Sequence, residues 1–410
     1  MTQLFSDNTM ALVGVQRILG HIKGTNTGPT IVFFGGIHGN ELAGVIALQQ
    51  TFKELEGQQE SLYGEFIGIA GNLKALKKEV RFVDEDLNRI WLPEQLEGLK
   101  ESVENLNAEE QEMAELNSII DENISNSNPP FYFIDLHTTS GKTEPFIVMN
   151  DSLLNRSFTK KYPLPVILGI EEYLTGALLS RINEMGYVAF GFESGQHEDE
   201  KAVINAKNFI EYTLGLVGFN PMGKIQLNRI KAKLQEYNEA PQRFYEIYYQ
   251  HLIQNGSLFK MLPGFVNFQF VPKGISIAMN GDGLITTDKK RQLFMPLYQD
   301  KGYEGFYFIR SIPLFYLWLS KYLRKLKVDG WISRLPGVRW ASPKKETLVL
   351  DKRIARFFAK SFFHLLGYRA REMDGNRLLL KNRERNSKTA FYKSAPWRRK
   401  NNLLVFRKTL

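Results

Sequence analysis

IVFFGGIHGNE, residues 31–41, joins a predicted strand to a predicted helix. Residues 31–34 form a short apolar run, which is typical of a buried strand, and two glycines end it. Residues 42–55 then carry apolar side chains at helical spacing. His38 and Glu41 are therefore predicted in a tight turn at the carboxyl end of a strand, where α/β proteins build their sites. Both are good zinc ligands, although such a pair alone is also found in ordinary loops.

The composition narrows the class of protein. A chain of 410 residues is too long to fold around one ordinary core, so two or three domains are expected. The content of 43% hydrophobic residues indicates a well-packed globular protein. There is no cysteine, so a metal site must use histidines and carboxylates. The N-terminus lacks the pattern of a signal peptide, and the longest apolar cluster is roughly half of the ~20 residues that span a bilayer. We therefore expect a cytoplasmic protein.

Strand and helix patterns alternate through residue 216, which predicts an α/β fold with a mixed sheet flanked by helices. Short strands separated by turns follow residue 221. Residues 301–410 carry 27 Lys and Arg against 7 Asp and Glu, a balance of +20, so the first 300 residues carry 9 − 20 = −11. We predict a catalytic α/β domain at 1–220, a small β-rich domain at 221–310 and a basic α+β C-terminal extension at 311–410.

Two further segments carry structural predictions. Residues 94–124 are acidic with an apolar stripe, which predicts one long amphipathic helix or a helical hairpin. Residues 381–410 are basic and end in WRRKNNLLVFRKTL, which indicates a loosely ordered tail.

Further candidate residues lie at the ends of other predicted strands. His137 ends the strand FYFIDLH, in which Asp135 is placed to orient a ligand, and Glu193 ends YVAFGFE. Zinc held by His38, Glu41 and His137 would leave a fourth position for water and lower the pKa of that water towards ~7. Glu193 could then take a proton and pass it to a leaving amine. Each residue alone has a plainer reading, as a loop residue, a helix cap or a surface charge.

Residues 81–89 add a segment that could face the substrate. Arg81 and Arg89 carry guanidinium groups, which bind carboxylates in a bidentate manner and stabilise an oxyanion. The alternative is a surface loop in which Asp84 pairs with an arginine.

GGIHGNE, Arg81 with VDEDLNR, DLHTTSG and FESGQH occur in this order over residues 25–215. Together they resemble the succinylglutamate desuccinylase/aspartoacylase family of the zinc carboxypeptidase superfamily. The resemblance implies a zinc carboxypeptidase-like fold and one zinc ion per subunit.

The resemblance also implies residue roles: His38, Glu41 and His137 as zinc ligands, Arg81 polarising the amide carbonyl, Asn88 and Arg89 holding the substrate carboxylate, and Glu193 as base and acid. The expected activity is the deacylation of a small anionic N-acyl amino acid by zinc-activated water. The segment LLSRINEMGYVAF does not align with the family's side-chain clamp.

Two alternatives stay open. The same chemistry and the same carboxylate clamp would serve a zinc carboxypeptidase that acts on a short peptide. The basic extension could bind nucleic acid or an anionic membrane, or it could dock on the acidic remainder of the chain or on a second subunit of a homo-oligomer.

Overall fold

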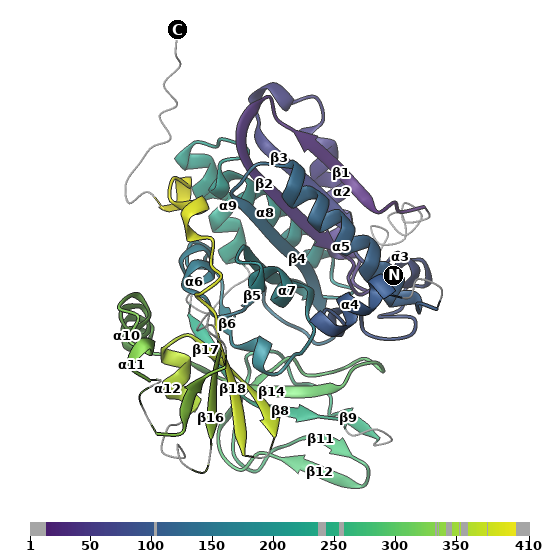
Figure 1. Cartoon of the computed structure of the whole chain (residues 1–410). Helices are drawn as coiled ribbons and strands as arrows, with labels where there is room; N and C mark the ends of the chain where they lie inside the picture. Colours follow the sequence, from purple (N-terminus) through teal and green to yellow (C-terminus); the bar gives the residue numbers. More distant parts are fainter. Residues whose placement is uncertain are drawn as a thin grey trace.

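The computed structural model describes residues 14–101, 105–236, 243–253, 258–332, 334, 336–341, 347–351, 353, 360–374 and 376–398. An eleven-stranded mixed sheet runs through the molecule (Figure 1). Its strands, in spatial order, are β1 (Ile18–Lys23), β3 (Tyr63–Ala70), β2 (Asn26–Gly35), β4 (Phe131–Thr139), β7 (Val188–Gln196), β5 (Phe146–Met149), β6 (Val166–Leu168), β8 (Phe244–Leu252), β14 (Glu304–Ser311), β13 (Arg291–Phe294) and β10 (Phe270–Val271).

The centre of the sheet is parallel, because β3, β2, β4 and β7 run in one direction. β1 and β5 are antiparallel to their neighbours β3 and β7. This arrangement confirms the predicted mixed α/β sheet. The parallel strands bring their carboxyl ends to one edge, and this edge carries the candidate site.

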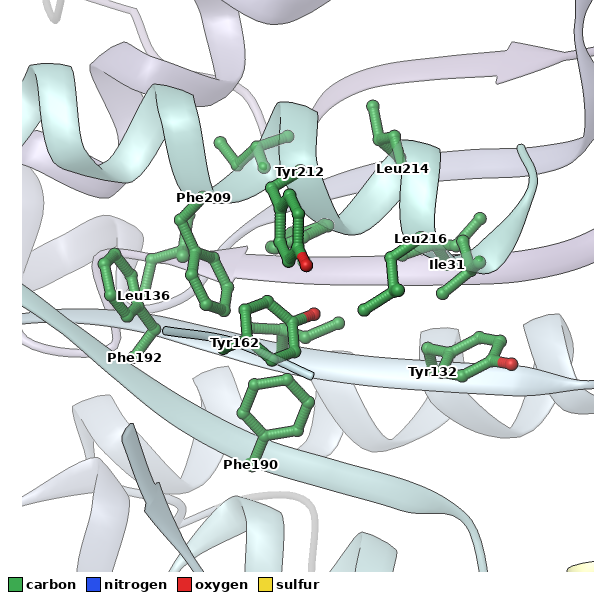
Figure 2. Packing of buried hydrophobic residues seen from close by; sticks show 14 of the residues in the cluster. Ile31, Tyr132, Leu136, Tyr162, Phe190, Phe192, Phe209, Tyr212, Leu214 and Leu216 are labelled. Carbon is green, nitrogen blue, oxygen red and sulfur yellow. The ribbon is translucent and has the colours of Figure 1, made fainter. Parts of the chain in front are cut away.

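Helices cover both faces of the sheet, and the side chains of β2 alternate between them. Ile31 and Phe33 face one core with α2, α6, α8 and α9, whereas Val32 and Phe34 face the other with α5 and α7. Figure 2 shows the aromatic packing of the first core, in which the rings of Phe192 and Phe209 stack at 3.8 Å. The helices are α2 (Ala43–Leu55), α3 (Leu73–Lys78), α4 (Pro93–Glu101), α5 (Ala108–Asn126), α6 (Leu153–Thr159), α7 (Leu178–Glu184), α8 (Glu200–Val217) and α9 (Lys224–Glu236).

The acidic segment, predicted as one long helix or a helical hairpin, forms two helices, α4 and α5. Asn107 begins α5 with a capping box: its side chain accepts a hydrogen bond from the Glu110 backbone N–H, and the Glu110 side chain accepts one from the Asn107 N–H. Glu109 is fully buried in the first turn, where it accepts hydrogen bonds from the backbone N–H groups of Val83 and Asp84. The helix therefore fixes the 81–89 segment in place.

The strands after residue 243 extend the large sheet, since β8 pairs in parallel with β6. A separate three-stranded sheet contains β12 (Gly283–Thr286), β11 (Ser276–Asn280) and β9 (Phe259–Met261). The three-domain division stays a prediction.

The basic extension contains a separate four-stranded sheet (Figure 1). Its elements are α10 (Leu314–Lys325), α11 (Asp329–Ile332), β15 (Val338–Trp340), β16 (Thr347–Asp351), α12 (Lys360–Leu365), β17 (Tyr368–Asp374) and β18 (Arg377–Asn382), followed by the 3₁₀ turns η4 (Thr389–Tyr392) and η5 (Pro396–Arg398).

The expectation of a loose tail after residue 381 is wrong as far as residue 398. Tyr392 is buried and donates a hydrogen bond to the Phe131 carbonyl, and the Trp397 indole N–H donates one to the Tyr132 hydroxyl at 2.8 Å. Basic composition predicted a solvated chain, but two aromatic anchors hold it on the sheet. Residues 399–410 lie outside the described residues.

Candidate metal centre and active site

The turn after β2 holds His38 and Glu41 as predicted, between Gly35 at the end of the strand and Ala43 at the start of α2. Gly39 lies against the backbone of α3: a Cβ there would come within 2.1 Å of the Ala75 carbonyl carbon. Only glycine fits this close approach. The Gly39 N–H also donates to the Arg81 carbonyl at 3.2 Å, which joins the turn to the 81–89 segment.

His38, Glu41 and His137 converge into one buried cluster. His38 Nδ1 lies 2.8 Å from Glu41 Oε1, and His137 Nδ1 lies 2.9 Å from Glu41 Oε2. One ligand atom from each residue lies within 4.8 Å of the others. Two imidazole nitrogens and a carboxylate oxygen are a donor set that zinc takes in catalytic sites, so the residues fit a divalent metal ion.

A carboxylate lies behind each imidazole. His38 Nε2 is 3.2 Å from Asp86 Oδ1, and His137 Nε2 is 2.6 Å from Asp135 Oδ2. Such contacts fix the orientation and tautomer of a ligating histidine and raise its basicity. Asp135 was anticipated from its position in the strand, but Asp86 was not, because only tertiary packing brings residue 86 next to residue 38.

The buried cluster contains carboxyl and imidazole groups that shift each other's pKa values. Burial opposes ionisation of Glu41, but the flanking His38 and His137 hold the pKa of that carboxyl well below its usual range. Burial likewise opposes protonation of His137, yet Asp135 and Glu41 raise its pKa well above the usual range. Glu41 and His137 thus favour each other's charged forms.

Glu193 lies beside the cluster because β7 pairs with β4 in a register that sets Glu193 opposite His137. Its side chain is buried, and Oε2 has no hydrogen-bond partner among the described residues. Burial raises the pKa of Glu193 to about 8, and the nearby Glu41 contributes to the rise while His137 opposes it. A buried carboxyl with a raised pKa is typical of a group that exchanges protons.

Three residues of the 81–89 segment, Arg81, Asn88 and Arg89, line the same cavity. Arg81 Nη2 lies 3.0 Å from Asp86 Oδ2 and Arg81 Nη1 lies 3.6 Å from Glu41 Oε1. The ion pairs of Arg81 are therefore with Asp86 and Glu41, whereas the Asp84 carboxylate caps α5 by accepting from the Ala108 N–H.

Asn88 and Arg89 are held in the 3₁₀ turn η2 (Leu87–Arg89). Asn88 Oδ1 accepts a hydrogen bond from the Leu178 N–H at 3.0 Å. Arg89 Nη2 pairs with Glu304 Oε1 of β14 at 3.1 Å. Glu304 was missed by sequence reasoning, because it lies more than two hundred residues further along the chain.

One cavity of about 130 Å³ joins these groups, and every predicted site residue lines it. His197 also lines it, where its Nδ1 is 2.7 Å from the Thr138 hydroxyl and its Nε2 is 3.2 Å from Gln299 Oε1. The lining also has an apolar part, made by the side chains of Val148, Ile170, Leu174, Leu179, Phe190 and Leu297, and the polar Asn150, Glu171 and Ser180 line the cavity as well.

The fold and the cluster define an α/β protein with a candidate metal centre at the carboxyl ends of its central strands. Residues 27–198 match the model of the succinylglutamate desuccinylase/aspartoacylase catalytic domain. This part of the chain is therefore similar to the catalytic domain of that family.

Curated relatives show the same similarity. The chain is 29% identical over 293 residues to a probable aspartoacylase of Prochlorococcus marinus (strain AS9601), covering 65% of this chain and 87% of that protein. It is 26% identical over 288 residues to a succinylglutamate desuccinylase of Photorhabdus laumondii subsp. laumondii, covering 66% and 81% of the two chains.

Solved structures show the same fold. A succinylglutamate desuccinylase/aspartoacylase from Rhodobacter sphaeroides superposes with a TM-score of 0.53 at 18% identity, covering 71% of this chain and 88% of that chain. A succinylglutamate desuccinylase from Vibrio parahaemolyticus gives a TM-score of 0.52 at 14% identity, covering 74% and 95%.

Proposed function

We propose that the protein is a zinc-dependent hydrolase that cleaves the amide bond of an N-acyl amino acid. The observation that carries the proposal is the buried cluster of His38, Glu41 and His137 with Glu193 beside it in one cavity. The relatives named aspartoacylase and succinylglutamate desuccinylase support deacylation as the reaction class.

His38, Glu41 and His137 would hold the zinc ion, and Asp86 and Asp135 would orient the two imidazoles. Zinc in such a site acts as a Lewis acid towards a carbonyl group and makes water acidic near neutral pH.

Glu193 is proposed to take a proton from the water that attacks the amide carbon. As the C–N bond breaks, the same carboxyl delivers that proton to the departing amine. Arg81 lies within 3.6 Å of Glu41 and lines the cavity, and its guanidinium would stabilise the oxyanion.

Asn88 and Arg89 are proposed to bind the substrate carboxylate. Arg89 already shares its charge with Glu304, and this pair is largely buried. Among the described residues that line the cavity, the cationic side chains besides histidine are Arg81 and Arg89. The cavity therefore offers one strong carboxylate site.

The rest of the substrate would lie against the apolar wall. Leu179 of α7 lines the cavity, whereas Arg181 of the same helix is not among the lining residues. A second carboxylate against Leu174 and Leu179 would lose its hydration without gaining a cation. We therefore propose a substrate with one carboxylate and an apolar side chain or acyl group.

Asp135→Asn tests the support behind His137. The change removes the charge of the carboxylate 2.6 Å from His137 Nε2, so we expect metal affinity to fall about 10–100-fold. Competition with a chelator, followed by measurement of zinc content, gives the affinity. Unchanged zinc affinity would argue against His137 as a ligand.

A substrate panel tests the function itself. The zinc-loaded protein is assayed on N-acetyl-leucine, N-acetyl-methionine, N-acetyl-aspartate, N-succinyl-glutamate and short peptides, with chelator-treated protein as the control. We expect kcat/KM for the apolar N-acetyl amino acids to exceed that for N-acetyl-aspartate by on the order of tenfold or more.

The results separate the two parts of the proposal. No hydrolysis of any N-acyl amino acid, with cleavage of peptides, would support the carboxypeptidase alternative. Faster hydrolysis of the dicarboxylates would leave the deacylase proposal standing and reject the apolar substrate.

A further inference from the structure

Helix α10 buries polar side chains and exposes large apolar ones, which is the reverse of an ordinary surface helix. Its buried residues are Ser320 and Arg324, while Leu314 is 80% exposed and Trp318 is 54% exposed. A surface helix normally turns its apolar stripe towards the core and its charges towards water. The exposed apolar side chains of the helix and of the residue after it are Leu314, Phe315, Tyr316, Trp318, Tyr322 and Leu326.

The inversion has a clear cause in the docking contacts. Arg324 Nη2 pairs with Asp151 Oδ2 at 2.7 Å, and the Ser320 hydroxyl donates to the Leu365 carbonyl at 2.8 Å. These polar contacts share the inward side of α10 with the partly buried Leu317 and Leu323, so its aromatic side points outwards. α10 and α11 lie at the outer edge of the molecule (Figure 1).

The exposed side chains form a continuous surface. Leu314, Trp318 and Tyr322 recur every fourth residue and therefore lie in one row along the helix. The Trp318 ring lies 4.5 Å from Tyr322 and 6.2 Å from Phe315, measured between ring centres. Contiguous exposed apolar surface of this kind marks an interaction site. We call Leu314, Phe315, Trp318, Tyr322 and Leu326 the α10 face.

Positive charge accompanies the α10 face. Apart from the buried and paired Arg324, residues 313–334 contain four Lys and Arg and one Asp, a balance of +3. Lys321 and Lys325 are both exposed on α10, and Lys327 is exposed just after it. The guanidinium carbon of Arg334 lies 5.2 Å from the ring centre of the exposed Trp331.

This combination matches the interface of an anionic bilayer. Trp and Tyr favour the headgroup region, and nearby lysines are attracted to anionic lipids. Twelve residues of helix are about 18 Å long, short of the ~30 Å hydrocarbon core. No helix among the described residues is long and apolar enough to cross a membrane. An amphipathic helix of this length would lie in the plane of the interface.

We propose that the α10 face binds the surface of membranes that contain anionic lipids. Nucleic acid fits less well, because the aliphatic Leu314 and Leu326 offer a base no aromatic stacking. The lysines beside the face are complementary to anionic headgroups, whereas a second copy of the face would bring like charges together.

The test is co-sedimentation of the full chain with phosphatidylcholine vesicles, with and without phosphatidylglycerol. We expect binding to the anionic vesicles that weakens with salt. A blue shift of tryptophan emission should accompany binding, since Trp318 and Trp331 are exposed while Trp91 and Trp397 are already buried.

The variant Trp318→Ser/Leu326→Ser should reduce vesicle affinity by on the order of tenfold or more. The matched control is Ile225→Ser/Leu284→Ser, which removes two exposed apolar side chains far from α10 in sequence, 84% and 61% exposed, and should bind as the wild type does. Lys321→Glu/Lys325→Glu changes only exposed charges on α10 and should weaken binding to anionic vesicles without altering thermal stability.

Three results would overturn the proposal. These are no vesicle binding by the wild type, equal binding to both kinds of vesicle, and equal loss of binding in the control variant. Concentration-dependent dimerisation or RNA binding that the Trp318→Ser/Leu326→Ser variant loses, in a chain that ignores vesicles, would assign the face to those partners instead.

Discussion

Replacing Glu193 with glutamine is expected to lower kcat by on the order of 10²–10⁴-fold while zinc content stays that of the wild type. Glutamine keeps the size of the side chain in its buried position opposite His137, but it cannot accept the proton of the attacking water. The measurement is steady-state kinetics on the best substrate of the panel, with metal analysis of the same samples.

Glu65→Gln is the matched control for this change. Glu65 is 5% exposed on β3, as Glu193 is on β7, but it does not line the cavity and pairs instead with Lys23 at 3.0 Å. We expect near-normal turnover in this variant. If Glu193→Gln kept comparable activity with bound zinc, the base would have to be another residue.

Arg324→Ala is expected to destabilise the protein by about 1.5–3 kcal/mol, because it removes charge-assisted hydrogen bonds from a buried network in which Asp151 keeps Arg156 as a partner. The Arg324 side chain is 0% exposed and pairs with Asp151 and Glu384. It also donates a hydrogen bond to the His364 carbonyl at 2.8 Å. The substitution thus removes a contact between the extension and the loop before α6, and it also removes contacts within the extension.

Thermal unfolding and limited proteolysis measure this effect, with Arg310→Ala as the control. Arg310 pairs with Glu246 at 2.6 Å, but its side chain is 63% exposed, so its loss should cost at most about 1 kcal/mol. Equal melting of Arg324→Ala and the wild type would show that the buried pairs do not secure the extension.

The sequence left open whether the basic extension docks on the acidic remainder of the chain, and the ion pairs of the extension bear on this alternative. Arg383 pairs with Glu171 at 2.8 Å and with Glu172 at 3.0 Å, and Lys381 pairs with Glu184 at 2.8 Å. The excess positive charge of residues 311–398 is thus partly used against acidic groups of the catalytic part. Glu171 lines the cavity, so the extension also supports one wall of the candidate active site.

The sequence alone was enough to predict the mixed α/β sheet and seven of the residues that line the cavity. Short continuous apolar runs and glycine-rich turns are local signals, and they placed His38, Glu41, His137 and Glu193 at strand ends. Because parallel strands present their carboxyl ends at one edge, these local positions implied a common site. The roles of the residues stay proposals.

Tertiary structure alone decided what surrounds that site. Asp86 behind His38, Glu304 against Arg89 and the apolar wall near Leu179 come from segments whose spacing along the chain carries no signal of contact. The orientation of α10 was likewise hidden, because an amphipathic pattern predicts that the apolar stripe is turned inwards and gives no sign of an exception. Buried ion pairs at Arg324 set that orientation, and such pairs form only when distant parts of the chain meet.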